Sequence, residues 1–157
     1  MKLEIREHPD PILREKSEEI KEVNDEIRDL IEDMFETMYA NEGVGLSGVQ
    51  VGVLKRISVV DTGDGRRVFI NPKIVRREKN IPSEEGCLSL PGVLLEIKRA
   101  EKITVEALNE RGEKFELNAD GLLSRCIQHE IDHLDGVLIL DRISLWDKIK
   151  NKIFSKS

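Results

Sequence analysis

The feature that most constrains this chain is a nine-residue stretch near its C-terminal end, residues 128–136 (QHEIDHLDG). It contains the pattern His-Glu-x-x-His. On an α-helix, which turns by about 100° per residue, His133 lies roughly 40° around the axis from His129, so both imidazoles can reach one ion. Apolar residues at helical spacing surround the pattern, with Asp120 as a candidate N-cap and the final glycine as a candidate end. The stretch therefore predicts a helix that carries two metal ligands and a neighbouring carboxylate, Glu130.

A solvated amphipathic helix with two incidental histidines would give the same pattern. The chain contains only three histidines, however, and two of them have the spacing that one ion requires. The third, His8, has no partner at ligand spacing, and we expect it to lie on the surface. A metal site is the favoured interpretation, and it requires a third ligand from another part of the sequence.

Two cysteines compete for the place of the third ligand. Cys126 lies on the same predicted helix, seven residues from His133, which corresponds to a rise of about 10.5 Å. Metal bonds to sulfur and nitrogen are only about 2.0 to 2.3 Å long, so these two residues cannot bind one ion together with His129. Cys87 follows a glycine in residues 84–92 (EEGCLSLPG), on a predicted tight loop or strand edge where a thiolate can face a cleft. Cys87 is therefore the predicted ligand, and Cys126 is a small apolar neighbour.

A Cys-His-His ligand set is typical of catalytic metal sites because it leaves a fourth position for water. The metal lowers the pKa of that water toward neutrality, which makes hydroxide available as a nucleophile. Glu130 is next to the ligands and is not needed as one, so it can accept the proton and pass it to a leaving group. Glu130 and the three predicted ligands, Cys87, His129 and His133, together indicate metal-dependent hydrolysis of a carbonyl compound.

The remaining sequence predicts one α+β domain. Residues 27–38 carry apolar side chains at helical spacing after Asn24 and Asp25, which indicates an amphipathic helix that ends before Gly43. Strands are expected at 56–61, at 67–71 with Pro72 ending the pairing, at 102–108 and at 113–117. We expect mixed or antiparallel strands packed around a central helix that carries the metal-binding motif. The whole chain, 1–157, is expected to be a single catalytic domain with a short basic helix at about 142–157.

Composition limits the functions open to the chain. Its net charge of −6 argues against a nucleic-acid binder as a whole. Residues 142–157 carry five basic side chains and one acidic one, and they form either a solvated helix end or a contact for an acidic partner such as ribosomal RNA. We find no signal peptide and no apolar run of the roughly 20 residues needed to span a bilayer, so we expect a cytoplasmic protein without membrane contact.

Residues 43–52 (GVGLSGVQVG) contain four glycines. Such a density indicates special backbone dihedrals or the close approach of another backbone. The stretch lacks the Gly-Lys-Ser/Thr ending of a phosphate-binding loop, and no dinucleotide fingerprint fits it, so nucleotide binding is not expected. By itself the stretch is equally compatible with a simple glycine-rich turn.

These three stretches together resemble the motifs of the peptide deformylases, enzymes that remove the N-formyl group from the initiator methionine of new bacterial proteins. That family has a glycine-rich motif ending in Gln, a Glu-Gly-Cys-Leu-Ser motif and a Gln-His-Glu-x-Asp-His-Leu-x-Gly motif, in this order. Here they are residues 43–50, 85–89 and 128–136. The likeness also runs through residues 8–11 (HPDP) and the first predicted helix, so it covers nearly the whole chain.

The resemblance implies a role for each site residue. Cys87, His129 and His133 would bind the metal, with Glu130 as general acid/base. Gln50 and the backbone N–H of Leu88 would stabilise the oxyanion. The substrate peptide would pair with Val44, Gly45 and Leu46, and its methionine side chain would enter an apolar pocket lined by Val44, Leu122, Cys126 and the region of His129. The family likeness also implies ferrous iron, which zinc, nickel or cobalt can replace, and a monomer that acts on the N-formyl-methionyl ends of nascent chains.

The chain departs from the family pattern at three positions. Ser47 and Gly48 stand where the family usually has Ala-Ala, and a glycine two residues before Gln50 predicts a less rigidly held oxyanion donor. Leu94 stands where some members carry an arginine that touches the peptide, so substrate affinity or sequence preference is expected to differ.

Two other functions remain open at this point. A metallopeptidase shares the His-Glu-x-x-His pattern but often takes its third ligand from a downstream His or Glu, and no later histidine exists in this chain. A metal-holding or ribosome-associated protein without turnover is the second alternative, which the Ser47-Gly48 departure and the basic tail make conceivable.

Overall fold

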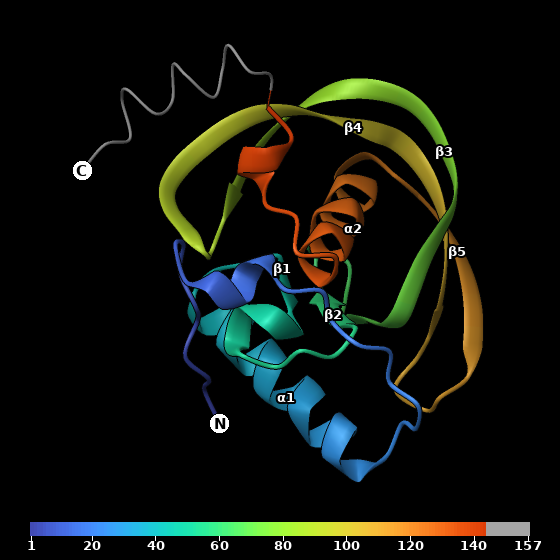
Figure 1. Ribbon diagram of the computed structural model, residues 1–157. Coiled ribbons are helices and arrows are strands. Elements are labelled where there is room, and N and C mark those ends of the chain that lie inside the picture. Colours follow the sequence, from blue (N-terminus) through green and yellow to red (C-terminus); the bar gives the residue numbers. More distant parts are fainter. Residues whose placement is uncertain (144–157) are drawn as a thin grey trace.

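A single antiparallel sheet of five strands, in the order β1-β2-β3-β4-β5, forms the framework of the computed structural model, which describes residues 1–143 (Figure 1). The strands are β1 (Gly45–Ser47), β2 (Ile57–Val60), β3 (Arg67–Cys87), β4 (Leu90–Leu108) and β5 (Lys114–Asp120), the helices are α1 (Asp25–Ala40) and α2 (Gly121–Leu134), and three short 3-10 turns cover Pro11–Arg14, Gly48–Val51 and Ile139–Asp141. The predicted α+β class is confirmed, and the sheet is antiparallel throughout. Within residues 1–143 no helix is long and apolar enough to cross a membrane. The expected basic helix at 142–157 lies almost wholly outside the described residues.

The first helix follows directly from its sequence pattern. Asn24 is its N-cap, and its side chain accepts a hydrogen bond from the backbone N–H of Ile27 at 3.0 Å. The apolar face is buried against β1 and β2, in a cluster that contains Ile27, Ile31, Met34, Phe35, Met38, Leu46, Ile57 and Val59. The helix ends at Ala40, shortly before the glycine-rich stretch, as predicted.

The longest element is the hairpin of β3 and β4, with strands of 21 and 19 residues. Pairing with β2 stops at Ile70, just before Pro72, as predicted. The expected end of the strand at residue 71 was wrong, because β3 continues past the proline along β4. The register shifts between Ile70 and Lys73, where Asn71 has a φ of 51°, and this irregularity accommodates a residue that has no N–H to donate.

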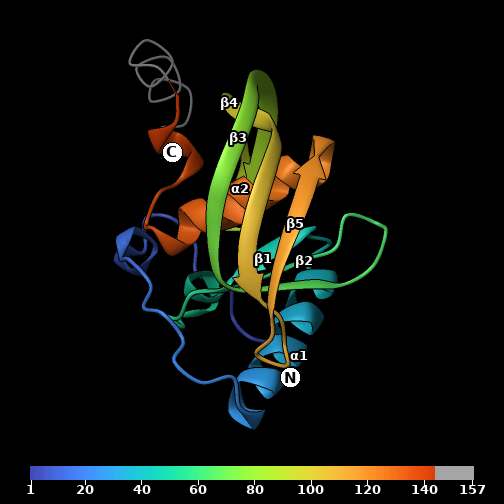
Figure 2. The same ribbon diagram turned by 90° about the vertical axis from the view of Figure 1, so that its right-hand side faces the viewer.

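Curvature of the sheet creates the place for the second helix. Figures 1 and 2 show β3 and β4 bending around α2, which lies against the inner face of the sheet. The buried side of α2 contributes Cys126, Ile127 and Ile131 to a cluster that also contains Phe69, Ile103, Val105 and Ala119 from β3, β4 and β5. Asp120 is at the predicted N-cap position, although its side chain makes no capping hydrogen bond. After α2, Gly136 has a φ of 74°, and a Cβ there would collide with the backbone carbonyl of Arg14.

Candidate metal centre

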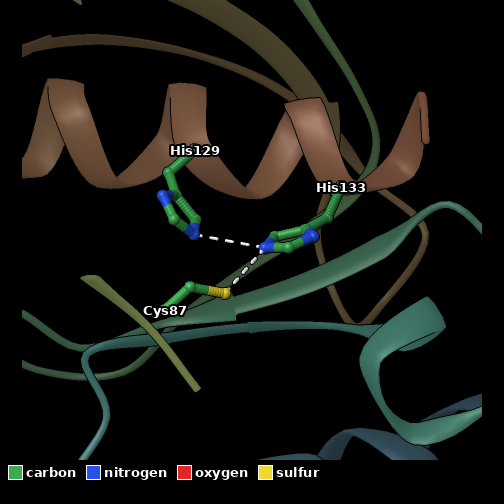
Figure 3. A group of neighbouring side chains, drawn as sticks. All are labelled: Cys87, His129 and His133. Atoms are coloured by element: carbon green, nitrogen blue, oxygen red, sulfur yellow. Dashed lines mark hydrogen bonds between the residues drawn. The ribbon is translucent and has the colours of Figure 1, made fainter. Parts of the chain in front are cut away.

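The three predicted ligands meet at one point, although Cys87 is more than 40 residues from the two histidines in sequence (Figure 3). Cys87 is the last residue of β3, and His129 and His133 project from α2. His133 Nε2 lies 3.1 Å from His129 Nε2 and 3.2 Å from Cys87 Sγ, and all three ligand atoms lie within 4.8 Å of one another. Ligand atoms on one tetrahedral ion are about 3.3 to 3.6 Å apart, given bonds of about 2.0 to 2.3 Å. The two distances from His133 Nε2 are within a few tenths of an ångström of that spacing, and the donor set of one thiol and two imidazoles suits a single divalent metal ion.

A buried carboxylate fixes the orientation of His129. Its Nδ1–H donates to Glu85 Oε1 at 2.9 Å, which leaves Nε2 directed at the other two ligands. Glu85 also accepts two hydrogen bonds from Arg99, at 2.9 and 3.0 Å. Burial raises the pKa of Glu85, but the hydrogen bonds from His129 and Arg99 outweigh it and lower the pKa to about 2. Glu85 is therefore a carboxylate at all ordinary pH values.

Arg99 connects this carboxylate to the helix. Its side chain is 3% exposed, and its guanidinium also donates to Asp132 Oδ2 at 2.6 Å, while Arg142 donates to Asp132 Oδ1 at 2.7 Å. Sequence reasoning missed Arg99, because an arginine in a strand rich in charged residues looks like a surface residue. Glu85 was part of a motif, but its partner could not be identified without the register of β3 and β4.

The two imidazoles differ in their electrostatics. Burial lowers the pKa of His133 well below its ordinary value, and the nearby positive charges of His129 and Arg99 lower it further, so the ring is neutral, as a ligand must be. Burial also opposes the charged form of His129, but its interactions with Cys87 and Glu85 raise its pKa to about 10. A cation that binds His129 Nε2 therefore has to displace a proton.

Glu130 lies beside the cluster without being part of it. Its side chain is 4% exposed and lines the adjoining cavity. Burial raises its pKa, an effect opposed by the charge of His129 and by a hydrogen bond from Ser47. A carboxyl group with a raised pKa is suited to exchanging a proton near neutral pH.

A cavity of about 650 Å³ opens beside the cluster. Of the predicted site residues, those that line it are Val44, Gly45, Gln50, Cys87, Leu88, Leu122, Cys126, His129 and Glu130. His133 and Leu46 do not line it. The side chain of Leu46 is fully buried in the core beneath α1, so only its backbone is available at the edge strand β1.

The amide of Gln50 points toward the metal cluster. Its Oε1 accepts a hydrogen bond from the backbone N–H of Ser47 at 2.9 Å. Its Nε2 donates to Ser89 Oγ at 3.2 Å and to Cys87 Sγ at 3.5 Å. Cys126 also lines the cavity, and burial, reinforced by the charge of Glu130, raises its pKa well above the ordinary value, so it remains a neutral thiol.

The departures from the family pattern have clear structural settings. Gly48 is buried, and a Cβ there would lie 2.9 Å from the carbonyl oxygen of Val53 and 3.1 Å from that of Lys55. The backbone at Gly48 is therefore closely packed. This packing argues against the prediction that Gly48 leaves the nearby Gln50 side chain loosely held. Leu94 is 67% exposed on β4, where its side chain packs beside Gly86.

Comparison with known proteins agrees with the motifs. The sequence matches the polypeptide deformylase family over residues 2–149. It is 48% identical to the peptide deformylase of Thermodesulfovibrio yellowstonii over 98% of this chain and 94% of that protein. The structure is similar to the crystal structure of the peptide deformylase from Thermotoga maritima, with a TM-score of 0.90, 43% identity and coverage of 92% of this chain and 99% of that one.

A second crystal structure, a peptide deformylase from Synechococcus elongatus in complex with actinonin, matches with a TM-score of 0.92 and 41% identity over 98% of this chain and 85% of that one. Sequence and fold thus agree with these proteins over nearly the full length of the chain, and the chain belongs to the polypeptide deformylase family.

Proposed function

We propose that this peptide deformylase, an enzyme that removes the N-formyl group from nascent polypeptides, works through a divalent metal ion held by Cys87, His129 and His133. The observation that carries this proposal is the convergence of these three ligand atoms beside a cavity that is lined by Cys87, His129 and Glu130. When bound, the ion would act as a Lewis acid and lower the pKa of water toward neutrality.

Glu130 is the proposed general acid/base. It would take a proton from the attacking water and deliver it to the amide nitrogen of the substrate methionine as the bond between the formyl carbon and that nitrogen breaks. The products are formate and a peptide with a free amino terminus. Burial of Glu130 supports this role because it raises the pKa of the carboxyl group toward the range in which both protonation states are accessible.

Two donors are proposed to stabilise the negative charge that develops on the formyl oxygen. One is Gln50 Nε2, which already points at the thiol of Cys87 because the Ser47 N–H holds the other end of the amide. The other is the backbone N–H of Leu88, the residue that follows Cys87 at the cavity wall. Donors fixed before the reaction cost no reorganisation when charge develops.

The edge of β1 is the proposed peptide-binding strand. Val44, Gly45 and Leu46 would pair with an extended substrate, because β1 has a neighbour on one side only in the described sheet. Because Gly45 has no side chain, α2 can place Glu130 and Cys126 close to the backbone of β1: a Cβ at Gly45 would lie 2.5 Å from Glu130 Oε2 and 2.9 Å from Cys126 Sγ. Val44, Leu122 and Cys126 would form the apolar pocket for the methionine side chain.

Ferrous iron is the metal that we propose, with zinc, nickel or cobalt as replacements. The ligand types alone do not select iron, since the usual affinity order favours zinc. We further infer a monomer that acts in the cytoplasm on nascent chains. The proposed ribosome contact involves the basic tail, which lies outside the described residues apart from Arg142 and Ile143.

Formate release from N-formyl-Met-Ala-Ser tests this function directly. The parent protein should release formate, a chelator should abolish the release, and Glu130→Ala should lower its rate by about 10²- to 10⁴-fold to a small residual value. Cleavage at internal peptide bonds would instead indicate a metallopeptidase. Metal binding without any turnover would indicate a binding protein.

A further inference from the structure

Ser47, the last residue of β1, makes an unusual set of contacts for a buried serine. It is fully buried, and its Oγ lies 2.9 Å from Glu130 Oε1, 2.9 Å from the backbone carbonyl oxygen of Glu130 and 2.8 Å from Ser58 Oγ. The residues are 83 positions apart in sequence, so the contact with Glu130 is purely tertiary. We propose that Ser47 is a positioning residue that sets the orientation of the Glu130 carboxylate for proton transfer.

Counting donors and acceptors gives the direction of these bonds. A hydroxyl has one hydrogen to donate, while an ionised carboxylate only accepts. Ser58 can donate to Ser47 Oγ, which frees the Ser47 hydrogen for Glu130. A hydrogen bond to a charged oxygen is stronger than one to a neutral carbonyl. The Ser47 hydroxyl therefore donates to Glu130 Oε1 whenever the carboxylate is ionised.

This bond makes the two carboxylate oxygens unequal. Oε1 is occupied by Ser47, whereas Oε2 lies beside Gly45, where an added Cβ would be 2.5 Å from it, and both Gly45 and Glu130 line the cavity. Oε2 is therefore the oxygen left to exchange a proton with the substrate. Without the Ser47 hydroxyl, the carboxylate could rotate about its terminal bond, a torsion with a broad energy profile, and spend less time in the productive orientation.

Ser47 is also linked to the oxyanion donor, through a different atom. Its backbone N–H holds Gln50 Oε1 at 2.9 Å, so one residue orients both the proposed acid/base and the proposed donor. Ser47→Ala removes only the side-chain contact and keeps the backbone one. The substitution thus separates the effect on Glu130 from any effect on Gln50.

The test is steady-state kinetics of formate release, and it rests on the proposed function. We expect Ser47→Ala to lower kcat by about tenfold, with KM changed by less than about twofold, because orientation affects the transition state more than substrate binding. Ser47→Thr keeps the hydroxyl and should retain most of kcat. Ser124→Ala is the matched control: Ser124 is equally buried and donates to the carbonyl oxygen of Ala100 at 3.0 Å, so its kcat should stay within about twofold of the parent.

A double-mutant cycle shows whether Ser47 acts through Glu130. In a Glu130→Ala background, Ser47→Ala should cause no further loss of the residual rate. Metal content and thermal unfolding, measured on every variant, report structural damage independently of activity. The proposal is overturned if kcat of Ser47→Ala equals that of the parent, if Ser124→Ala loses as much, or if the loss persists without Glu130. A parent protein that releases no formate would instead refute the proposed function.

Discussion

Arg99 provides the strongest test of how the metal centre is supported. Its side chain is 3% exposed and pairs with two carboxylates, Glu85 and Asp132, through contacts of 2.6 to 3.0 Å. Arg99→Met keeps an unbranched chain of similar length but removes the guanidinium from Glu85, which keeps its hydrogen bonds from His129 and Ser83, and it leaves Asp132 with Arg142. Breaking a buried ion pair by removing one partner costs about 3 to 5 kcal/mol, because the remaining charge stays desolvated.

We therefore expect Arg99→Met to lower the free energy of unfolding by about 3 to 5 kcal/mol. In a protein of 157 residues, each kcal/mol corresponds to about 2 to 4 °C, so Tm should fall by roughly 6 to 20 °C. Thermal unfolding followed by circular dichroism measures the change. The experiment should be run on both chelator-treated and metal-loaded protein, because a bound ion adds its own stabilisation.

Arg76→Met is the matched control, since Arg76 lies on β3 with a side chain that is 70% exposed and pairs with Glu78 at the surface. Exposed ion pairs contribute about 0 to 1 kcal/mol, so Tm of this variant should change by no more than about 4 °C. If Arg99→Met and Arg76→Met lowered Tm equally, the buried network around Glu85 would not stabilise the protein in the way described.

Three further predictions concern the site itself. Gly48→Ala should lower Tm, because the added methyl would meet the carbonyl oxygen of Val53 at 2.9 Å; an unchanged Tm would contradict this packing. Gly45→Ala should lower kcat by about tenfold or more by displacing the Glu130 carboxylate, and kinetics equal to the parent would argue against that contact. Chelation should abolish formate release and lower Tm, and added ferrous iron should restore both under anaerobic conditions; activity that survives dialysis against chelator would exclude the metal centre.

Local patterns were sufficient for the elements that depend on local physics. The repeat of apolar residues between Ile27 and Met38, with Asn24 before it, predicted α1 and its cap because helical periodicity and capping involve residues only a few positions apart. The same periodicity correctly predicted that His129 and His133 lie on one face of α2. Simple bond lengths were then enough to choose Cys87 over Cys126 as the third candidate ligand.

Only the tertiary structure decided which distant residues meet. The irregular register at Pro72, the length of the β3–β4 hairpin and the burial of Arg99 depend on how the sheet bends around α2. The contact between Ser47 and Glu130 likewise has no counterpart in sequence spacing. A sequence pattern specifies the face on which a side chain lies, but the partner on the opposite surface is set by strand register, bulges and packing, which are properties of the whole chain.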